Sequence, residues 1–289
     1  MLVHYKELFA KDFSGEYAIP AFNTQDLETT LGIVQAAISK RAPVIIAVSH
    51  GTIEYTGLPA IVDIVKDVAN NLKVNVPIAL HLDHTKDEPS IQEAVNGGFS
   101  SVMIDGSHLP FEENIGITKR VVDFAHSKNV WVQGELGRLR GNEDWISVND
   151  AESAFTDPQE AVKFVEMTGV DTLAIAVGTI HGIVKFREKI TPKLDIERIK
   201  TIDALISKPL ILHGASGVPE DQIKEAIAAG IQVINIDTEL RLAFTKGVRG
   251  ALEDKEMYDP RKILGPAIEE VKAAAEKKLD QFNTSNQIK

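Results

Sequence analysis

Eight short apolar runs recur along the sequence, separated by stretches with the periodicity of an amphipathic helix. Strands that are apolar almost throughout, each followed by a helix, are typical of a parallel sheet that is covered on both faces or closed into a barrel. The 289 residues fit a (β/α)₈ barrel of about 250 residues with extra segments. The predicted strands are residues 17–23, 43–49, 77–83, 101–106, 130–136, 171–178, 209–215 and 233–238.

An open, doubly wound sheet is the competing interpretation, but no G-x-G-x-x-G motif follows the first strand. We therefore predict one α/β domain over residues 1–289, a (β/α)₈ TIM barrel with additional C-terminal helices. Residues 138–158, after the fifth strand, form a segment too long and polar for a plain connection, and we expect a long mobile loop there. Residues 255–289 are predicted to be a C-terminal helical extension.

Composition narrows the class of protein. The chain has 31 Lys and Arg against 42 Asp and Glu, a net charge of −11, which argues against nucleic acid as a partner. It has no cysteine, so disulfides and thiolate metal sites are excluded. The N-terminus lacks the apolar core of a secretory signal, and no run reaches transmembrane length. We therefore expect a cytoplasmic protein without a membrane partner.

Polar side chains gather at the carboxyl ends of the predicted strands, whereas residues such as Pro43, Pro77, Val130 and Pro209 stand at the opposite ends. In a TIM barrel the carboxyl ends form the mouth of the active site. The polar residues at these ends are Asn23, Ser49, Asp83, His84, Asp105, Ser107, His108, Glu135, His181, His213, Asn235, Asp237 and Thr238.

Three of these histidines suggest a metal site. His84, His181 and His213 would lie at one level of the barrel, and three neutral imidazoles suit a catalytic Zn²⁺ with one open position. Any one of them alone would be better explained as an ordinary core or surface histidine. His81, two residues before Asp83, lies one layer deeper and is interpreted as structural, with support of a metal ligand as the lesser option.

The turns after the seventh and eighth strands, residues 213–217 and 235–238, suggest a phosphate cradle. Loops at these places in TIM barrels commonly bind phosphate through backbone N–H groups and a helix N-terminus. Gly214 and Gly217 allow close approach, and Ser216 and Thr238 offer hydroxyl groups. An ordinary turn is an equally good interpretation of these residues taken alone.

Taken together, the motifs resemble the class II (zinc-dependent) fructose-bisphosphate and tagatose-bisphosphate aldolases. The resemblance runs from AFN at 21–23 to DPRK at 259–262 and continues into the tail. The loop departs from the family pattern, because Arg140 and Asn142 replace a glycine and a frequent acid. The motifs that carry the resemblance are HLDH (81–84), GFSSVMIDGSHLPFEEN (98–114), ELG (135–137), NED (142–144), GTIHG (178–182), LHGASG (212–217) and NIDT (235–238).

The resemblance implies roles for these residues. Asp83 would be the acid/base for the aldehyde-derived hydroxyl, and Glu143 the base that deprotonates the triose phosphate. The implied ligands of a catalytic Zn²⁺ are His84, His181 and His213, with Glu135 as an additional metal ligand, at a second Zn²⁺ site, or as a supporting carboxylate. Backbone groups around Ile180, Gly182 and Gly214 resemble a site for Na⁺ or K⁺. The implied substrate and phosphate contacts are Asn23, Ser49, Gly182, Gly214, Ser216, Asn235, Asp237, Thr238 and Arg261, the last reaching a neighbouring subunit of a homodimer or homotetramer.

The implied reaction is the reversible, metal-dependent cleavage of fructose 1,6-bisphosphate to dihydroxyacetone phosphate and glyceraldehyde 3-phosphate. None of the eight predicted strands contains a lysine, so an imine mechanism lacks its nucleophile, and this favours the metal independently of the resemblance. Tagatose 1,6-bisphosphate is the alternative substrate, because the two sugars differ at one hydroxyl. A non-catalytic sugar-phosphate-binding subunit is the remote alternative.

Overall fold

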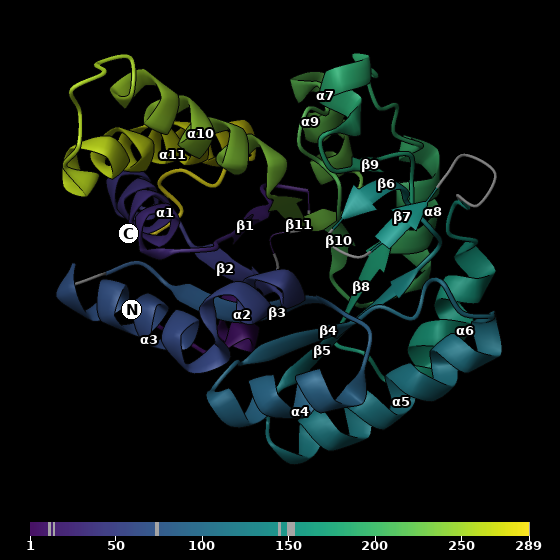
Figure 1. Ribbon diagram of the computed structural model, residues 1–289. Coiled ribbons are helices and arrows are strands. Elements are labelled where there is room, and N and C mark those ends of the chain that lie inside the picture. Colours follow the sequence, from purple (N-terminus) through teal and green to yellow (C-terminus); the bar gives the residue numbers. More distant parts are fainter. Residues whose placement is uncertain (11–12, 14, 73–74, 144–145, 149–153, 289) are drawn as a thin grey trace.

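Eight parallel strands close into a barrel in the order β1-β11-β10-β8-β5-β4-β3-β2 (Figure 1). The computed structural model describes residues 1–10, 13, 15–72, 75–143, 146–148 and 154–288. All eight strands predicted from the apolar runs are confirmed, with ends that differ by a few residues. The barrel strands are β1 (Ile19–Asn23), β2 (Val44–Ser49), β3 (Ile78–Thr85), β4 (Ser101–Ile104), β5 (Trp131–Leu136), β8 (Thr172–Ile175), β10 (Leu210–Leu212) and β11 (Ile231–Ile236).

Helices surround the barrel and bury their apolar faces against it (Figure 1). Aspartates at the N-caps of α1, α4 and α6 accept backbone N–H groups of the first turn, which satisfies donors that the helix itself cannot. No helix in the described part of the chain is long and apolar enough to span a membrane. These helices are α1 (Leu27–Lys40), α2 (His50–Thr56), α3 (Leu58–Asn71), α4 (Glu88–Gly97), α5 (Phe111–Ser127), α6 (Pro158–Thr168), α7 (Val184–Glu188), α8 (Ile196–Leu205) and α9 (Glu220–Ala228).

The segment predicted as a long loop after the fifth strand folds in part into a small sheet. Strands β6 (Arg140–Glu143), β7 (Ile146–Val148) and β9 (Ile180–His181) pair in the order β7-β6-β9. In this sheet Gly141 is registered with His181. The segment after β5 is therefore tied directly to one of the predicted metal ligands.

Two helices follow the last strand, α10 (Thr238–Ala251) and α11 (Pro260–Gln281), and α11 packs against both α10 and α1 (Figure 1). The chain after α11 returns to the start of the barrel, where Thr284 Oγ1 donates to Ala18 O at 2.6 Å. Farther on, the backbone N–H of Asn286 donates to Lys40 O at 2.7 Å. These contacts join the C-terminal extension to the barrel.

Aromatic side chains close the amino end of the barrel. The short 3₁₀ helix η1 (Tyr5–Phe9) lies there, and Phe9 stacks on Trp131 at the start of β5 with ring centroids 5.6 Å apart. Tyr5 and Phe13 are buried with the inward-facing residues of the strands. The amino end is therefore apolar and filled, so the polar residues at the carboxyl ends of the strands face the open mouth.

Candidate active site

The end of β3 presents two consecutive polar side chains to the mouth of the barrel. Side chains alternate along a regular strand, so Asp83 and His84 would normally point to opposite faces. His84 instead has φ = 43°, in the left-handed region, and the register between β3 and β4 shifts between Leu82 and Thr85. This irregularity turns His84 toward the same site as Asp83.

The three predicted metal ligands lie together. His84 Nε2 is 2.8 Å from His213 Nδ1, and the rings of His84 and His181 cross nearly at right angles with centroids 5.2 Å apart. The three buried imidazoles each offer a nitrogen within 4.8 Å of the others. A buried set of three imidazoles is the donor set of a catalytic Zn²⁺ site that keeps one position open.

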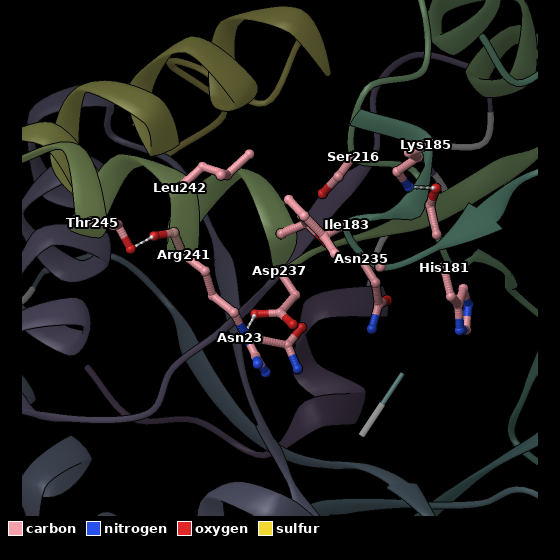
Figure 2. A pocket seen from close by; sticks show the side chains of 13 residues that line it. Asn23, His181, Ile183, Lys185, Ser216, Asn235, Asp237, Arg241, Leu242 and Thr245 are labelled. Atoms are coloured by element: carbon pink, nitrogen blue, oxygen red, sulfur yellow. Dashed lines mark hydrogen bonds and ion pairs between the residues drawn. The ribbon is translucent and has the colours of Figure 1, made fainter. Parts of the chain in front are cut away.

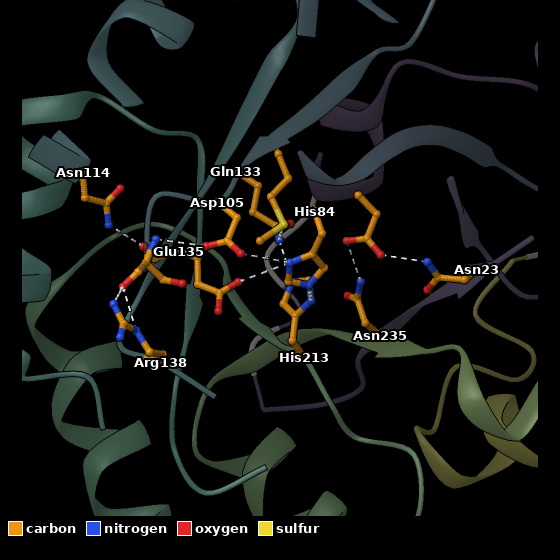
Figure 3. A network of polar contacts seen from close by, with 12 residues as sticks. Asn23, His84, Asp105, Asn114, Gln133, Glu135, Arg138, His213 and Asn235 are labelled. Atoms are coloured by element: carbon orange, nitrogen blue, oxygen red, sulfur yellow. Dashed lines mark hydrogen bonds and ion pairs between the residues drawn. The ribbon is translucent and has the colours of Figure 1, made fainter. Parts of the chain in front are cut away.

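Two carboxylates stand behind His84. Its Nδ1 lies 3.5 Å from Asp105 Oδ2 and 3.9 Å from Glu135 Oε2 (Figure 3). Burial by itself would raise the pKa of Asp105, but the hydrogen bond and charge of His84, with hydrogen bonds from Ser107, hold that pKa well below its usual range. His84, Asp105 and Glu135 also form a second group that could hold a metal. The sequence placed Asp105 at a strand end but gave it no role.

Asp83 contacts different partners. Asn23 Nδ2 donates to Asp83 Oδ2 at 2.8 Å, and Asn235 Nδ2 donates to Oδ1 at 3.4 Å (Figure 3). The two amides fix the carboxylate between β1 and β11. Asp105 is thus the carboxylate hydrogen-bonded to His84, while Asp83 is held beside the histidine cluster by two amides.

A pocket of about 320 Å³ is lined by His181 and by most of the residues predicted to bind substrate (Figure 2). Gly214 has φ = +66°, and a Cβ there would lie 2.8 Å from His181 Cδ2, so only glycine allows this approach. Helix α10 begins at this pocket with Thr238. The predicted residues that line the pocket are Asn23, Gly182, Gly214, Ser216, Asn235, Asp237 and Thr238.

Two cationic residues of the same pocket were missed by sequence reasoning. Lys185 is buried, and its ammonium donates to Ile180 O and, at 2.7 Å, to Gly214 O. Arg241 Nε donates to Asp237 Oδ1 at 2.7 Å. The Lys185 ammonium therefore lies against two of the carbonyls that were predicted to hold a monovalent cation. Lys185 follows the GTIHG motif on a short helix, and no spacing rule marks it.

Three predicted residues are not brought to this pocket by the described part of the chain. Ser49 caps α2 and accepts from Thr52 N at 3.4 Å. Arg261 lies at the start of α11, where it pairs with Asp259 at 2.9 Å and its side chain is 90% exposed. The backbone of Glu143 lies in β6, while its side chain, like residues 144–145 and 149–153, falls outside the described part.

His81 lies below this site inside the barrel. Its Nδ1 is 2.9 Å from Ser101 Oγ, and its ring centroid is 5.5 Å from that of Tyr5. Burial, together with the charge of His84, lowers the pKa of His81 to about 3. These contacts favour the structural interpretation of this histidine.

Comparison with known proteins gives one consistent answer. The family model described as fructose-bisphosphate aldolase class-II matches residues 3–287. The fructose-bisphosphate aldolase of Staphylococcus aureus (strain Mu50 / ATCC 700699) is 42% identical over 290 residues, covering 100% of this chain and 99% of the relative.

Solved structures agree with this result. The YdjI aldolase from Escherichia coli K12 has a TM-score of 0.81 at 33% identity, over 94% of both chains. The fructose-bisphosphate aldolase of Campylobacter jejuni has a TM-score of 0.78 at 23% identity, over 94% of this chain and 91% of that one, and shows a shared fold.

Proposed function

This chain belongs to the class II fructose-bisphosphate aldolase family, and from that membership we propose that it cleaves fructose 1,6-bisphosphate reversibly to dihydroxyacetone phosphate and glyceraldehyde 3-phosphate. The observation that carries the proposal is the position of the three buried histidines, which lie beside a pocket lined by the predicted phosphate contacts. One site would thus provide both the ligands for a metal and a pocket for the substrate.

His84, His181 and His213 would hold the catalytic Zn²⁺. When bound, the metal would act as a Lewis acid that polarises the ketone and stabilises the negative charge left by carbon–carbon cleavage. The burial of these imidazoles and the carboxylate behind His84 support the assignment, because a metal-binding histidine is usually oriented through its other nitrogen. Glu135, with His84 and Asp105, would provide a second metal position.

The proton transfers are assigned to two carboxylates. In the cleavage direction Asp83 would take the proton of the C4 hydroxyl while the C3–C4 bond breaks. Glu143 would then return a proton to C3, which completes dihydroxyacetone phosphate. The amides of Asn23 and Asn235 hold Asp83 as an acceptor at the edge of the pocket. Glu143 lies on the strand that pairs with β9, the strand of His181.

The phosphate would bind in the pocket between β10 and α10. Backbone N–H groups at the start of α10 and the hydroxyls of Ser216 and Thr238 are typical phosphate donors. Lys185 and Arg241 add positive charge at the same place. Since the Lys185 ammonium already contacts Ile180 O and Gly214 O, binding of Na⁺ or K⁺ there stays a prediction, tested by the dependence of activity on each ion.

Arg261 would bind the second phosphate of the substrate that lies in the active site of a neighbouring subunit. Its exposure and its absence from the lining of the pocket in its own chain support this role, which requires at least a homodimer. Ser49 is proposed to contact a substrate hydroxyl.

The test is a coupled aldolase assay on fructose 1,6-bisphosphate and tagatose 1,6-bisphosphate. We expect activity to disappear with a chelator, to return with Zn²⁺ or Co²⁺, and to survive borohydride added with substrate. His181→Ala should abolish activity, whereas the matched control His126→Ala, on the exposed side of α5, should not. Chelator-resistant cleavage would contradict the metal mechanism.

The same assay separates the alternatives. A higher kcat/KM on tagatose 1,6-bisphosphate would establish the alternative sugar with the same site. Sugar-phosphate binding without turnover in zinc-loaded protein would establish the non-catalytic interpretation.

A further inference from the structure

Lys278 is a buried lysine in the C-terminal extension. It lies near the end of α11, and only 6% of its side chain is exposed. A buried ammonium costs free energy unless charged or polar groups surround it. Lys278 Nζ donates to Gln281 Oε1 at 3.0 Å and lies 2.8 Å from Glu239 Oε2. The carboxylate of Glu239, on α10, therefore balances the charge of Lys278.

Glu239 also contacts the turn that follows β10. It lies in the first turn of α10, and its Oε2 accepts the backbone N–H of Gly217 at 3.2 Å. The turn itself is closed by the N–H of Val218, which donates to Ala215 O at 3.0 Å, so the N–H of Gly217 is free to bond outside it. One carboxylate oxygen thus joins the turn after β10 to both α10 and α11.

The hydrogen bond from Gly217 to Glu239 holds a turn that belongs to the pocket. Gly217 has φ = +78°, the value of the third residue of a type II turn, which favours glycine. Ser216 is the other central residue of this turn, and it is buried and lines the pocket (Figure 2). Holding Gly217 in place therefore also holds the residue whose hydroxyl would meet the phosphate.

The charge of Glu239 is unfavourable for an anion in this pocket. Ser216 and Thr238 line the pocket, and each immediately precedes one of the two residues joined by the Gly217–Glu239 hydrogen bond. A phosphate bound there would lie near a carboxylate, and partly buried like charges repel with little screening by water. Lys278 contacts the same carboxylate oxygen that accepts from Gly217, so its ammonium cancels this charge from the side of α11.

We propose that Glu239 and Lys278 are positioning residues for the phosphate of the substrate. Glu239 holds the turn of Ser216 against α10, and Lys278 neutralises Glu239 so that the carboxylate does not repel the phosphate. Neither is among the pocket-lining residues of the described chain, so both act without touching the phosphate. This inference rests on the phosphate pocket of the proposed function.

Charge variants test the neutralisation. The Kd of dihydroxyacetone phosphate is measured by calorimetry on zinc-loaded protein, and KM and kcat are measured with fructose 1,6-bisphosphate. Lys278→Met leaves the carboxylate uncompensated and should raise Kd and KM about 10-fold, while kcat changes by less than about twofold. Adding Glu239→Gln to Lys278→Met removes the charge and keeps an acceptor for Gly217, so both constants should return to within about twofold of wild type.

A second double variant tests the hydrogen bond to the turn. Glu239→Ala combined with Lys278→Met is also neutral at this place, but it has no acceptor for the N–H of Gly217. It should bind dihydroxyacetone phosphate about 5-fold more weakly than the double variant with glutamine. Both double variants lose the same ion pair between α10 and α11, so a difference between them reports on the turn.

The matched control is Lys246→Met. Lys246 Nζ lies 2.8 Å from Glu270 Oε2, so it forms a surface ion pair between the same two helices, and neither residue lines the phosphate pocket of the described chain. We expect its Kd and KM to equal those of wild type. Glu239→Gln alone keeps Lys278 and should bind dihydroxyacetone phosphate at least as tightly as wild type, a result that does not depend on how Lys278→Met folds.

The outcomes separate the two parts of the inference. An unchanged Kd in Lys278→Met, or weaker binding in Glu239→Gln, would overturn the neutralisation. Equal Kd values in the two double variants would overturn the role of Glu239 in holding the turn. Failure of the wild-type protein to bind dihydroxyacetone phosphate would instead overturn the phosphate pocket of the proposed function, and this inference with it.

Discussion

Replacing His81 with glutamine should make the protein lose less stability in mild acid than the wild type does. His81 is buried, its Nδ1 contacts Ser101, and its Nε2 has no hydrogen-bond partner among the described residues. The protonated ring would therefore leave a charge and an N–H group unsatisfied in the barrel. Burial is the main reason that the pKa of His81 falls to about 3, with the charge of His84 as a smaller one.

The sign of the pH dependence follows from the two protonation states. In the unfolded chain the imidazole takes a proton near its ordinary pKa of 6.5, while in the folded protein it stays neutral down to about 3. The unfolded state thus binds more protons in this window, and stability falls as pH falls through it. Each pH unit corresponds to about 1.4 kcal/mol, so His81 alone should cost ~2 kcal/mol of unfolding free energy between about pH 6.5 and about pH 5.

The assay is urea unfolding of metal-free protein at about pH 7.5 and about pH 5. The wild type should lose ~2 kcal/mol more than His81→Gln between the two conditions. Glutamine can still hydrogen-bond to Ser101, and any uniform loss of stability cancels in this difference. His108→Gln, which removes an exposed imidazole, is the matched control and should lose as much as the wild type. Equal losses in wild type and His81→Gln would refute the argument that this histidine is held neutral.

Three further changes should separate metal binding, substrate binding and subunit assembly. Asp105→Asn replaces the negative carboxylate beside a metal-binding imidazole with a neutral amide and should weaken zinc binding about 10- to 100-fold in chelator competition, and an unchanged affinity would contradict this role. Lys185→Met should raise KM for the bisphosphate about 10- to 100-fold through loss of a charged hydrogen bond, whereas exposed Lys189→Met should leave KM unchanged. Co-expression of Arg261→Ala with Asp83→Ala should restore activity above either variant alone, because a mixed dimer contains one complete site, and no restoration would place Arg261 outside the partner's site.

Most of the architecture was predictable because it depends on local patterns. Apolar runs at a regular period predicted every barrel strand, and polar residues at their carboxyl ends predicted the mouth. Lys185 and Lys278 were not predictable in the same way. The ammonium of Lys185 is explained by the carbonyl of Ile180 in β9 together with that of Gly214 in the turn after β10, which is 29 residues away in sequence. Lys278 looks like an ordinary charged residue of α11 until Glu239 of α10 is placed beside it.

The end of β3 shows which features depend on the sequence alone and which depend on the tertiary structure. The sequence by itself determined that Asp83 and His84 stand at the end of a buried strand, where a barrel keeps its functional groups. Strand periodicity alone sends neighbouring side chains to opposite faces, so it does not explain how both reach one site. The tertiary structure did so through the left-handed residue and the register shift against β4. It also gave the two residues separate partners, Asp105 for the imidazole and two amides for the carboxylate, because those groups meet only when the barrel closes.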